Sequence, residues 1–186
     1  MKTMLAMIGI LTLTACGSKP ATDLYVLRAD SADSSMCRPT KMIAVARPVA
    51  PSQYDTKRMA ILLDNNHLTY YSGASWASPL PDQLQAFITD ALGQDVESDD
   101  NTAAVLKLTL REAHVININA PVVHLRIQGS LYDPVSKRVI QRLNINEKIP
   151  AAENHMPQIV DAFNQAASHA AQEIAKAMKL RCTRNR

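Results

Sequence analysis

Apolar and polar positions recur with two different periods along this chain of 186 residues. Two segments repeat apolar side chains every three or four positions, which predicts amphipathic helices over about 78–93 and 156–180. Several shorter segments alternate apolar with polar residues or run apolar for a few positions, which is typical of strands. The predicted strands cover residues 25–27, 41–49, 59–63, 67–71, 106–111, 122–132 and 138–147.

The order of these elements is strands, helix, strands, helix. A sheet with one apolar face must bury that face, and two amphipathic helices laid on it achieve this. We therefore predict an α+β fold with a mostly antiparallel or mixed sheet and both helices packed on one face. The length suits one such domain, which we place at residues 24–186.

The N-terminus has the pattern of a bacterial lipoprotein signal. Lys2 precedes an uncharged, largely apolar stretch at 4–15, which is shorter than the roughly 20 residues that span a bilayer. Leu13-Thr14-Ala15-Cys16 resembles the lipobox, which implies removal of residues 1–15 and attachment of a diacylglycerol and an N-acyl chain to Cys16. Residues 16–23 would then be the lipidated tether. The alternative is an ordinary secretory signal that happens to carry a cysteine.

The residue after the lipidated cysteine favours one of the two membranes. In enterobacteria an aspartate at that position retains a lipoprotein in the inner membrane, and Gly17 stands there instead. We therefore expect an anchor in the outer membrane, with the body facing the periplasm, and the inner membrane stays the alternative.

Two cysteines remain once Cys16 carries lipid. In the oxidising periplasm Cys37 and Cys182 are expected to form a disulfide. Closing so long a loop would contribute about 5 kcal/mol as an upper value in the chain-entropy model. Two free thiols are the alternative.

Charge and motifs exclude several functions. Lys and Arg number 20 against 17 Asp and Glu, and aromatics are 4%, so no basic stripe with interleaved aromatics indicates nucleic-acid binding. Phosphate-binding glycine loops and the Gly-x-Ser-x-Gly motif are absent from the sequence, so we expect neither an enzyme nor a cofactor. His114 and His124 could face each other across a hairpin near Asn119. With no carboxylate obviously near, a solvated pair is favoured over a metal site, and no metal is expected.

Aromatic residues gather ahead of the first predicted helix. Trp76, the sole tryptophan, follows Tyr71 and precedes Leu80. Tryptophan and tyrosine are favoured at the centres of interfaces, so these three residues are candidates for partner binding. Core packing at the junction of strand and helix is the alternative.

Short motifs occur in a characteristic order along the mature chain. Tyr25-Val26-Leu27 follows the tether, a proline-bearing link spans 45–54, and Trp76-Ala77-Ser78-Pro79-Leu80 enters the first helix. In this combination the sequence resembles the ABC-type transport auxiliary lipoprotein family of PqiC-like proteins, although that family often has an acid where Ser78 stands. The resemblance implies a non-enzymatic outer-membrane lipoprotein that serves an MCE-type system moving lipids between the two membranes.

The same resemblance implies the partners. These are an MCE-domain periplasmic protein and, through it, an inner-membrane permease and ATPase, and a homo-oligomeric ring would suit such ring-shaped assemblies. A structural lipoprotein scaffold of a secretion or outer-membrane assembly machine is the alternative function. A direct lipid carrier and a cell-wall hydrolase are further, less favoured readings.

Overall fold

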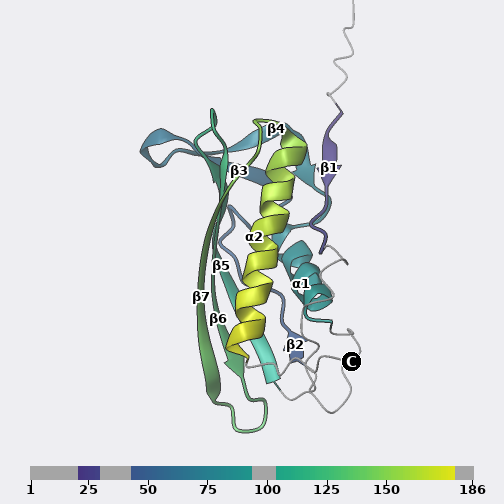
Figure 1. Ribbon diagram of the computed structural model, residues 1–186, viewed down its shortest axis with the longest axis vertical. Helices are drawn as coiled ribbons and strands as arrows, with labels where there is room; N and C mark the ends of the chain where they lie inside the picture. The colour runs from purple at the N-terminus through teal and green to yellow at the C-terminus, as the bar shows by residue number, and fades with distance from the viewer. Residues whose placement is uncertain (1–20, 30–42, 94–103, 179–186) are drawn as a thin grey trace, which may run out of the picture.

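The computed structural model describes residues 21–29, 43–93 and 104–178 (Figure 1). Within these ranges the chain forms a seven-stranded mixed sheet and two long helices, which confirms the predicted α+β class and element order. Neither helix is both long and apolar enough to cross a membrane. The elements are β1 (Asp23–Tyr25), β2 (Ile43–Val45), β3 (Arg58–Leu62), the 3₁₀ turn η1 (Asp64–Asn66), β4 (Leu68–Trp76), α1 (Leu80–Ala91), β5 (Ala104–Ile116), β6 (Val122–Tyr132), β7 (Val139–Pro150) and α2 (Met156–Ala177).

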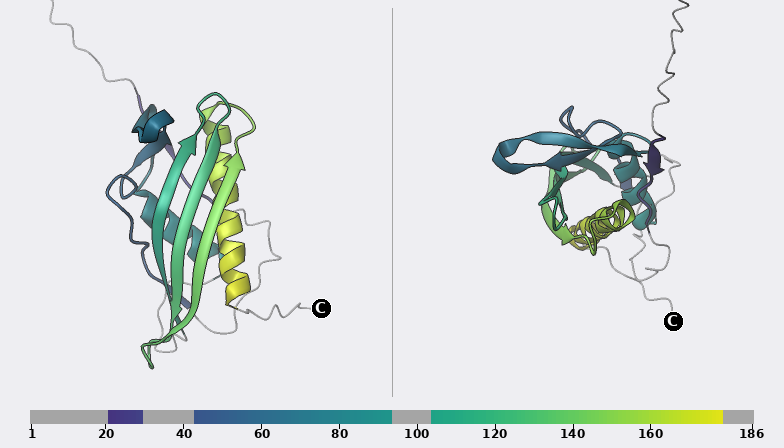
Figure 2. Two further views of the ribbon diagram at one scale, coloured as in Figure 1. Left: turned by 90° about the vertical axis from the view of Figure 1, so that its left-hand side faces the viewer. Right: turned by 90° about the horizontal axis from the view of Figure 1, so that it is seen from above.

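The strands follow the order β1-β4-β3-β5-β6-β7, with β2 paired to β5 alongside β3. The long strands β5, β6 and β7 form an antiparallel meander, whereas β1 runs parallel to β4 and both β2 and β3 run parallel to β5. β2 and β3 therefore lie one after the other along a single edge of β5. The sheet curves around the helices, as the view from above shows (Figure 2).

Both helices lie on the concave face of the sheet (Figure 2). α2 runs along β6 and β7 and also contacts α1. Small side chains on its buried face allow this close approach, because alanine adds little bulk between a helix and a sheet. The alanines with almost no exposed surface are Ala162, Ala166, Ala167, Ala170 and Ala171.

Most predicted boundaries hold to within a few residues. β2 ends at Val45, four residues before the predicted end, and β5 continues to Ile116, five residues beyond it. Two further strands differ because of how they pair. β1 begins and ends two residues before the predicted strand, since its pairing with β4 joins Asp23 to Ala74 and Tyr25 to Trp76. β4 continues to Trp76, five residues beyond the predicted end, because that same pairing extends it.

The molecule has two distinct ends. β1, the turn between β5 and β6 and the start of α2 lie toward the upper end in Figure 1, and the turn between β6 and β7 lies at the lower end. The lower turn exposes Val135, Val139 and Ile140.

Candidate functional site

The side of β5, β6 and β7 that is turned away from α2 is the candidate site, and we call it the outer face. Alternate residues of each strand reach it, and the register of the three strands places them in rows. Polar and charged side chains dominate these positions. They are Lys107, Thr109, Arg111, Glu112 and His114 on β5, His124, Arg126, Gln128, Ser130 and Tyr132 on β6, and Arg142, Asn144, Asn146 and Lys148 on β7.

A shallow groove of about 560 Å³ occupies the part of this face nearer the lower end. Three of its lining residues are cations, and no lining residue is an acid. We call it the basic groove. Its lining consists of Lys107, Thr109, Arg111, Gln128, Gly129, Ser130, Arg142, Leu143 and Asn144.

The cations of the basic groove lack carboxylate partners among the residues that the structure describes. Lys107 Nζ lies 4.7 Å from the centre of the Tyr132 ring, and Arg111 Nε donates a 2.9 Å hydrogen bond to Gln128 Oε1. Because neither contact neutralises the charge, the groove keeps a positive potential. Its guanidinium and hydroxyl donors suit carboxylate or phosphate groups on a partner.

A second set of polar residues lies further up the outer face, and we call Glu112, His114 and His124 the histidine cluster. His124 Nδ1 lies 3.0 Å from Glu112 Oε2, and the His114 and His124 rings meet edge to face at 5.3 Å between centroids. Arg126 Nη2 donates to Glu112 Oε1 at 2.9 Å. The histidines do face each other across the hairpin as expected, since His114 pairs with His124 in the register.

The cluster contains a carboxylate that the sequence pattern did not indicate. Strict alternation after Leu110 would place Glu112 on the helix-covered face. A β-bulge between Leu110 and Glu112 shifts the register, so that Arg111 and Glu112 both reach the outer face. The sequence does carry a sign of this shift. Apolar residues occupy even positions up to Leu110 and odd positions at Ala113 and Val115.

His114 is 2% exposed and lies beneath the Tyr54 ring, whose hydroxyl is 2.8 Å from His114 Nδ1. Burial, together with the nearby His124, lowers the pKa of His114 to about 4, so the imidazole is neutral at neutral pH. Burial likewise raises the pKa of the Tyr54 hydroxyl above its ordinary value. His114 Nε2 is buried and has no hydrogen-bond partner within the described residues.

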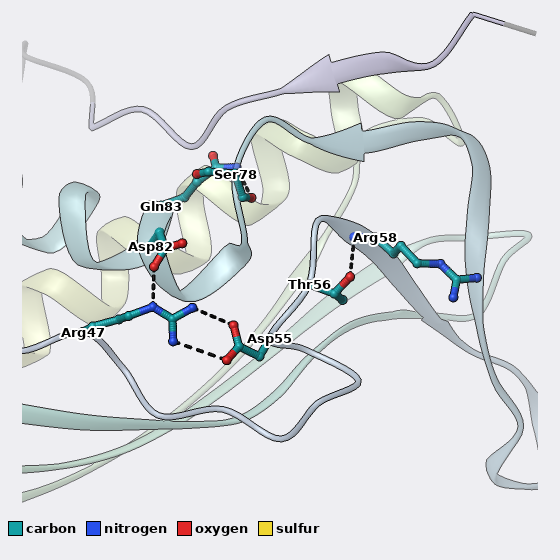
Figure 3. Close-up of polar contacts among 7 residues, drawn as sticks. All are labelled: Arg47, Asp55, Thr56, Arg58, Ser78, Asp82 and Gln83. Atoms are coloured by element: carbon teal, nitrogen blue, oxygen red, sulfur yellow. Dashed lines mark hydrogen bonds and ion pairs between the residues drawn. The ribbon is translucent and has the colours of Figure 1, made fainter.

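The segment that follows β2 is fastened to α1 by an ion-pair network (Figure 3). The Arg47 guanidinium makes two hydrogen bonds to the Asp55 carboxylate and contacts Asp82 on α1. The hydrogen bond from Arg47 lowers the pKa of the Asp55 carboxyl. All three side chains are partly exposed, so the network orients the segment more than it stabilises the fold.

The residues next to the predicted tether are held by one buried amide. Gln83 Oε1 accepts a 2.7 Å hydrogen bond from the Leu27 backbone N–H, and Gln83 Nε2 donates to the Tyr25 carbonyl. Gln83 Nε2 also donates to the Ser78 carbonyl (Figure 3). This side chain of α1 thus adds to the pairing of β1 with β4 in holding β1 and the residues after it. The sequence offered no signal for this role, because Gln83 sits within an otherwise ordinary amphipathic helix.

The predicted partner-binding residues lie mainly in the core. Trp76 is 1% exposed and packs edge to face on Phe163 with 5.2 Å between ring centroids, and Leu80 is 4% exposed. Neither side chain presents surface to a partner in this conformation, so core packing, the alternative, describes them. Tyr71 is half-buried against the core, and its hydroxyl is buried without a partner in the described part of the chain. A large apolar side chain at a junction of strand and helix serves packing as well as binding, so the aromatic pattern alone does not separate the two roles, and partner binding by Tyr71 stays a prediction.

Cys16, Cys37 and Cys182 all lie outside the described residues, so lipidation at the first and a disulfide between the other two stay predictions.

Residues 25–175 match the family model of the ABC-type transport auxiliary lipoprotein component, and the chain belongs to this family. It is accordingly a membrane-anchored lipoprotein of the cell envelope that assists an ABC transport system. No curated protein matches the sequence.

Solved structures share the fold. A Xanthomonas campestris protein of the family DUF330 superposes with a TM-score of 0.69 at 18% identity, over 87% of this chain and 93% of that one. A protein described as uncharacterized superposes with a TM-score of 0.67 at 14% identity, over 85% and 99% of the two chains. At these identities the likeness concerns the fold.

Proposed function

We propose that this protein is the accessory docking component of an MCE-type ABC lipid transport system that connects the inner and outer membranes. The observation that carries the proposal is the family match, which covers nearly all of the described chain. The acyl chains on Cys16 would anchor the protein in the outer membrane, with its body in the periplasm. Several buried chains give stable anchoring where a single chain would be marginal.

We place the contact with the transport system on the outer face. The opposite side of the same strands is covered by α2. The basic groove on the outer face is open and holds Lys107, Arg111 and Arg142 without acids. The partner we propose is an acidic surface of the MCE-domain periplasmic protein, which would link this lipoprotein to the permease and ATPase. Complementary charge would set the orientation and speed of docking more than its raw affinity.

A non-enzymatic role fits the polar groups. Within the described residues, histidine side chains contact Tyr54, Glu112, Asn146 and Glu147, and no serine, threonine or cysteine is hydrogen bonded to a histidine. A histidine-activated nucleophile of the hydrolase kind would need such a pair.

Affinity purification from detergent-solubilised native envelopes, followed by mass spectrometry, tests the proposal. The tagged wild type should enrich an MCE-domain protein over a tagged unrelated lipoprotein. A Lys107→Glu/Arg142→Glu variant should lose that enrichment, because it reverses the charge of the basic groove. The matched control is Arg28→Glu/Lys57→Glu, which reverses two exposed cations outside the groove and should keep the partner.

Two results would count against the proposal in different ways. Recovery of secretion or outer-membrane assembly components without an MCE-domain protein would replace it with the scaffold function. Loss of the MCE-domain protein with the control variant, and not with the groove variant, would keep the transport role and move the docking surface elsewhere.

A homo-oligomeric ring is part of the proposal, because MCE assemblies form rings or tubes and a matching symmetry would present several copies of the outer face at once. Sedimentation velocity of the lipidated protein in detergent should show a species larger than a monomer. A monomer at every concentration would contradict the ring.

A further inference from the structure

In the histidine cluster on the outer face, both ring nitrogens of His124 lie next to oxygen atoms. His124 Nε2 lies 2.7 Å from Asn146 Oδ1, and His124 Nδ1 lies 3.0 Å from Glu112 Oε2. Both ring nitrogens therefore face an oxygen acceptor. When His124 Nε2 donates to Asn146 Oδ1, the Nδ1 lone pair is directed at Glu112 Oε2, and a cation between these two atoms would bind both.

His114 supplies an independent observation at the same place. Its Nε2 is buried without a hydrogen-bond partner among the described residues, although the ring is only 2% exposed. A buried polar atom left unpaired destabilises the folded state, so such an atom calls for an explanation. The ligand atoms offered by His114, His124 and Glu112 all lie within 4.8 Å of one another.

We propose that Glu112, His114 and His124 form a binding site for a divalent transition-metal ion of the zinc class. Imidazole nitrogens and carboxylate oxygens are the ligands that zinc accepts, and three protein ligands with a further open position are a common arrangement. A small inward movement of the three side chains would bring their donors to bonding distance. Glu112 and His124 are partly exposed, which leaves a path to solvent and room for a water ligand.

The atoms of these side chains that would not bind metal are already held. Tyr54 contacts His114 Nδ1 at 2.8 Å, Asn146 contacts His124 Nε2 at 2.7 Å, and Arg126 donates to Glu112 Oε1 at 2.9 Å. Outer contacts of this kind fix the tautomer and orientation of metal ligands.

Two cations near the site weaken it. Lys148 pairs with His124 across β6 and β7, and Arg126 contacts Glu112 directly. The bound ion therefore meets repulsion that a site without these cations would not have. We expect binding that responds to the metal supplied, rather than an ion that survives purification in chelator.

Calorimetric titration of the full-length lipidated protein in detergent with Zn²⁺ tests the site, using a tag without histidines. One ion per chain should bind. Glu112→Gln and His124→Ala should each abolish the saturable heat, and Tyr54→Phe, which keeps the ring and removes the hydroxyl, should weaken binding by about 10- to 100-fold. Far-ultraviolet circular dichroism checks that each variant is folded.

His169→Ala is the matched control. His169 also contacts a single carboxylate, with Nδ1 3.1 Å from Glu147 Oε2, but no second histidine joins that pair. Its removal should leave the titration unchanged. Titration with Co²⁺ should give a visible spectrum without a thiolate charge-transfer band, because no cysteine belongs to the site.

Three results would overturn the proposal. They are the absence of saturable Zn²⁺ binding to the wild type, binding that survives both Glu112→Gln and His124→Ala, and a Co²⁺ spectrum dominated by thiolate ligation. None of these results bears on the docking function, which is tested by partner recovery and by charge reversal in the basic groove.

Discussion

The two faces of the β5–β7 meander differ in nearly every physical respect. The inner face meets α2 through apolar side chains such as Ile127 and Ile145, which are almost fully buried, and the outer face presents charges and amides to solvent. Stability is therefore concentrated on one side of these strands, and the chemistry available to a partner on the other. A substitution on the inner face should affect folding, and one at an exposed position of the outer face should affect recognition.

The largest effect on stability is expected when the aromatic contact between Trp76 and Phe163 in the core is removed. Phe163→Ala removes a ring that is 2% exposed and packs on Trp76, so it should lower the free energy of unfolding by about 3–5 kcal/mol. Urea denaturation followed by circular dichroism measures the change. A loss below about 1 kcal/mol, the size expected for a surface substitution, would contradict the assignment of this pair to the core.

The next effect concerns the attachment of β1. Gln83→Ala leaves the Leu27 N–H without its buried acceptor, which should cost about 1–3 kcal/mol. Hydrogen–deuterium exchange should rise in residues 21–29 more than in β6. The control is Gln85→Ala on the same helix, which removes a side-chain hydrogen bond to the Val45 carbonyl of β2. It should leave exchange at residues 21–29 unchanged. If Gln83→Ala raises exchange equally in residues 21–29 and in β6, Gln83 does not stabilise the attachment of β1 in particular.

Acid should destabilise the protein through His114. Its pKa is about 4 in the folded chain against an ordinary value of 6.5, so the unfolded state binds more protons between these values. Neutral His114 contributes fully to the free energy of unfolding above about pH 6.5, and this contribution is lost as the pH falls toward 4. About 2 kcal/mol of it is lost at pH 5. Urea denaturation at pH 7.5 and pH 5, with chelator present, measures the difference.

The comparison variant for the pH experiment is His114→Leu. It should show a smaller loss of stability at pH 5 than the wild type, because the groups facing that position (Tyr54, His124, Glu112 and Lys148) remain while the titrating ring is gone. Equal pH dependence in the two proteins would assign the acid sensitivity to other groups.

The smallest effect on stability is expected in the basic groove. Arg142 is exposed and has no carboxylate partner within the described residues, so Arg142→Glu should change the free energy of unfolding by less than about 0.5 kcal/mol. Partner recovery should fall despite the intact fold. A large destabilisation would show that the two faces are not energetically separate.

Sequence reasoning predicted the inner face well because burial imposes a period. Leu106, Leu108 and Leu110 alternate with polar residues, and the alanines of α2 recur every three or four positions, so strands, helices and the face they share could all be predicted. The parallel placement of β2 and β3 along β5 could not, because pairing between distant segments leaves no local pattern.

The outer face was predicted less well for a related reason. One extra residue at the bulge moved Glu112 and His114 across the sheet. The only trace of this shift in the sequence is that the apolar positions move from Leu110 to Ala113 and Val115. Trp76 was open to two interpretations because its size favours both interfaces and cores, and only its contact with Phe163 decides between them. The basic groove needed the register of three strands to bring Lys107, Arg111 and Arg142 together.

Site-specific photo-crosslinking in intact cells tests the central claim most directly. A photoreactive residue at Gln128, on the outer face, is compared with one at Glu173, on the exposed side of α2. Docking through the outer face predicts that position 128, and not position 173, becomes covalently joined to an MCE-domain protein identified by mass spectrometry. Crosslinks to that protein from position 173 alone, or crosslinks from position 128 only to secretion or assembly components, would contradict it.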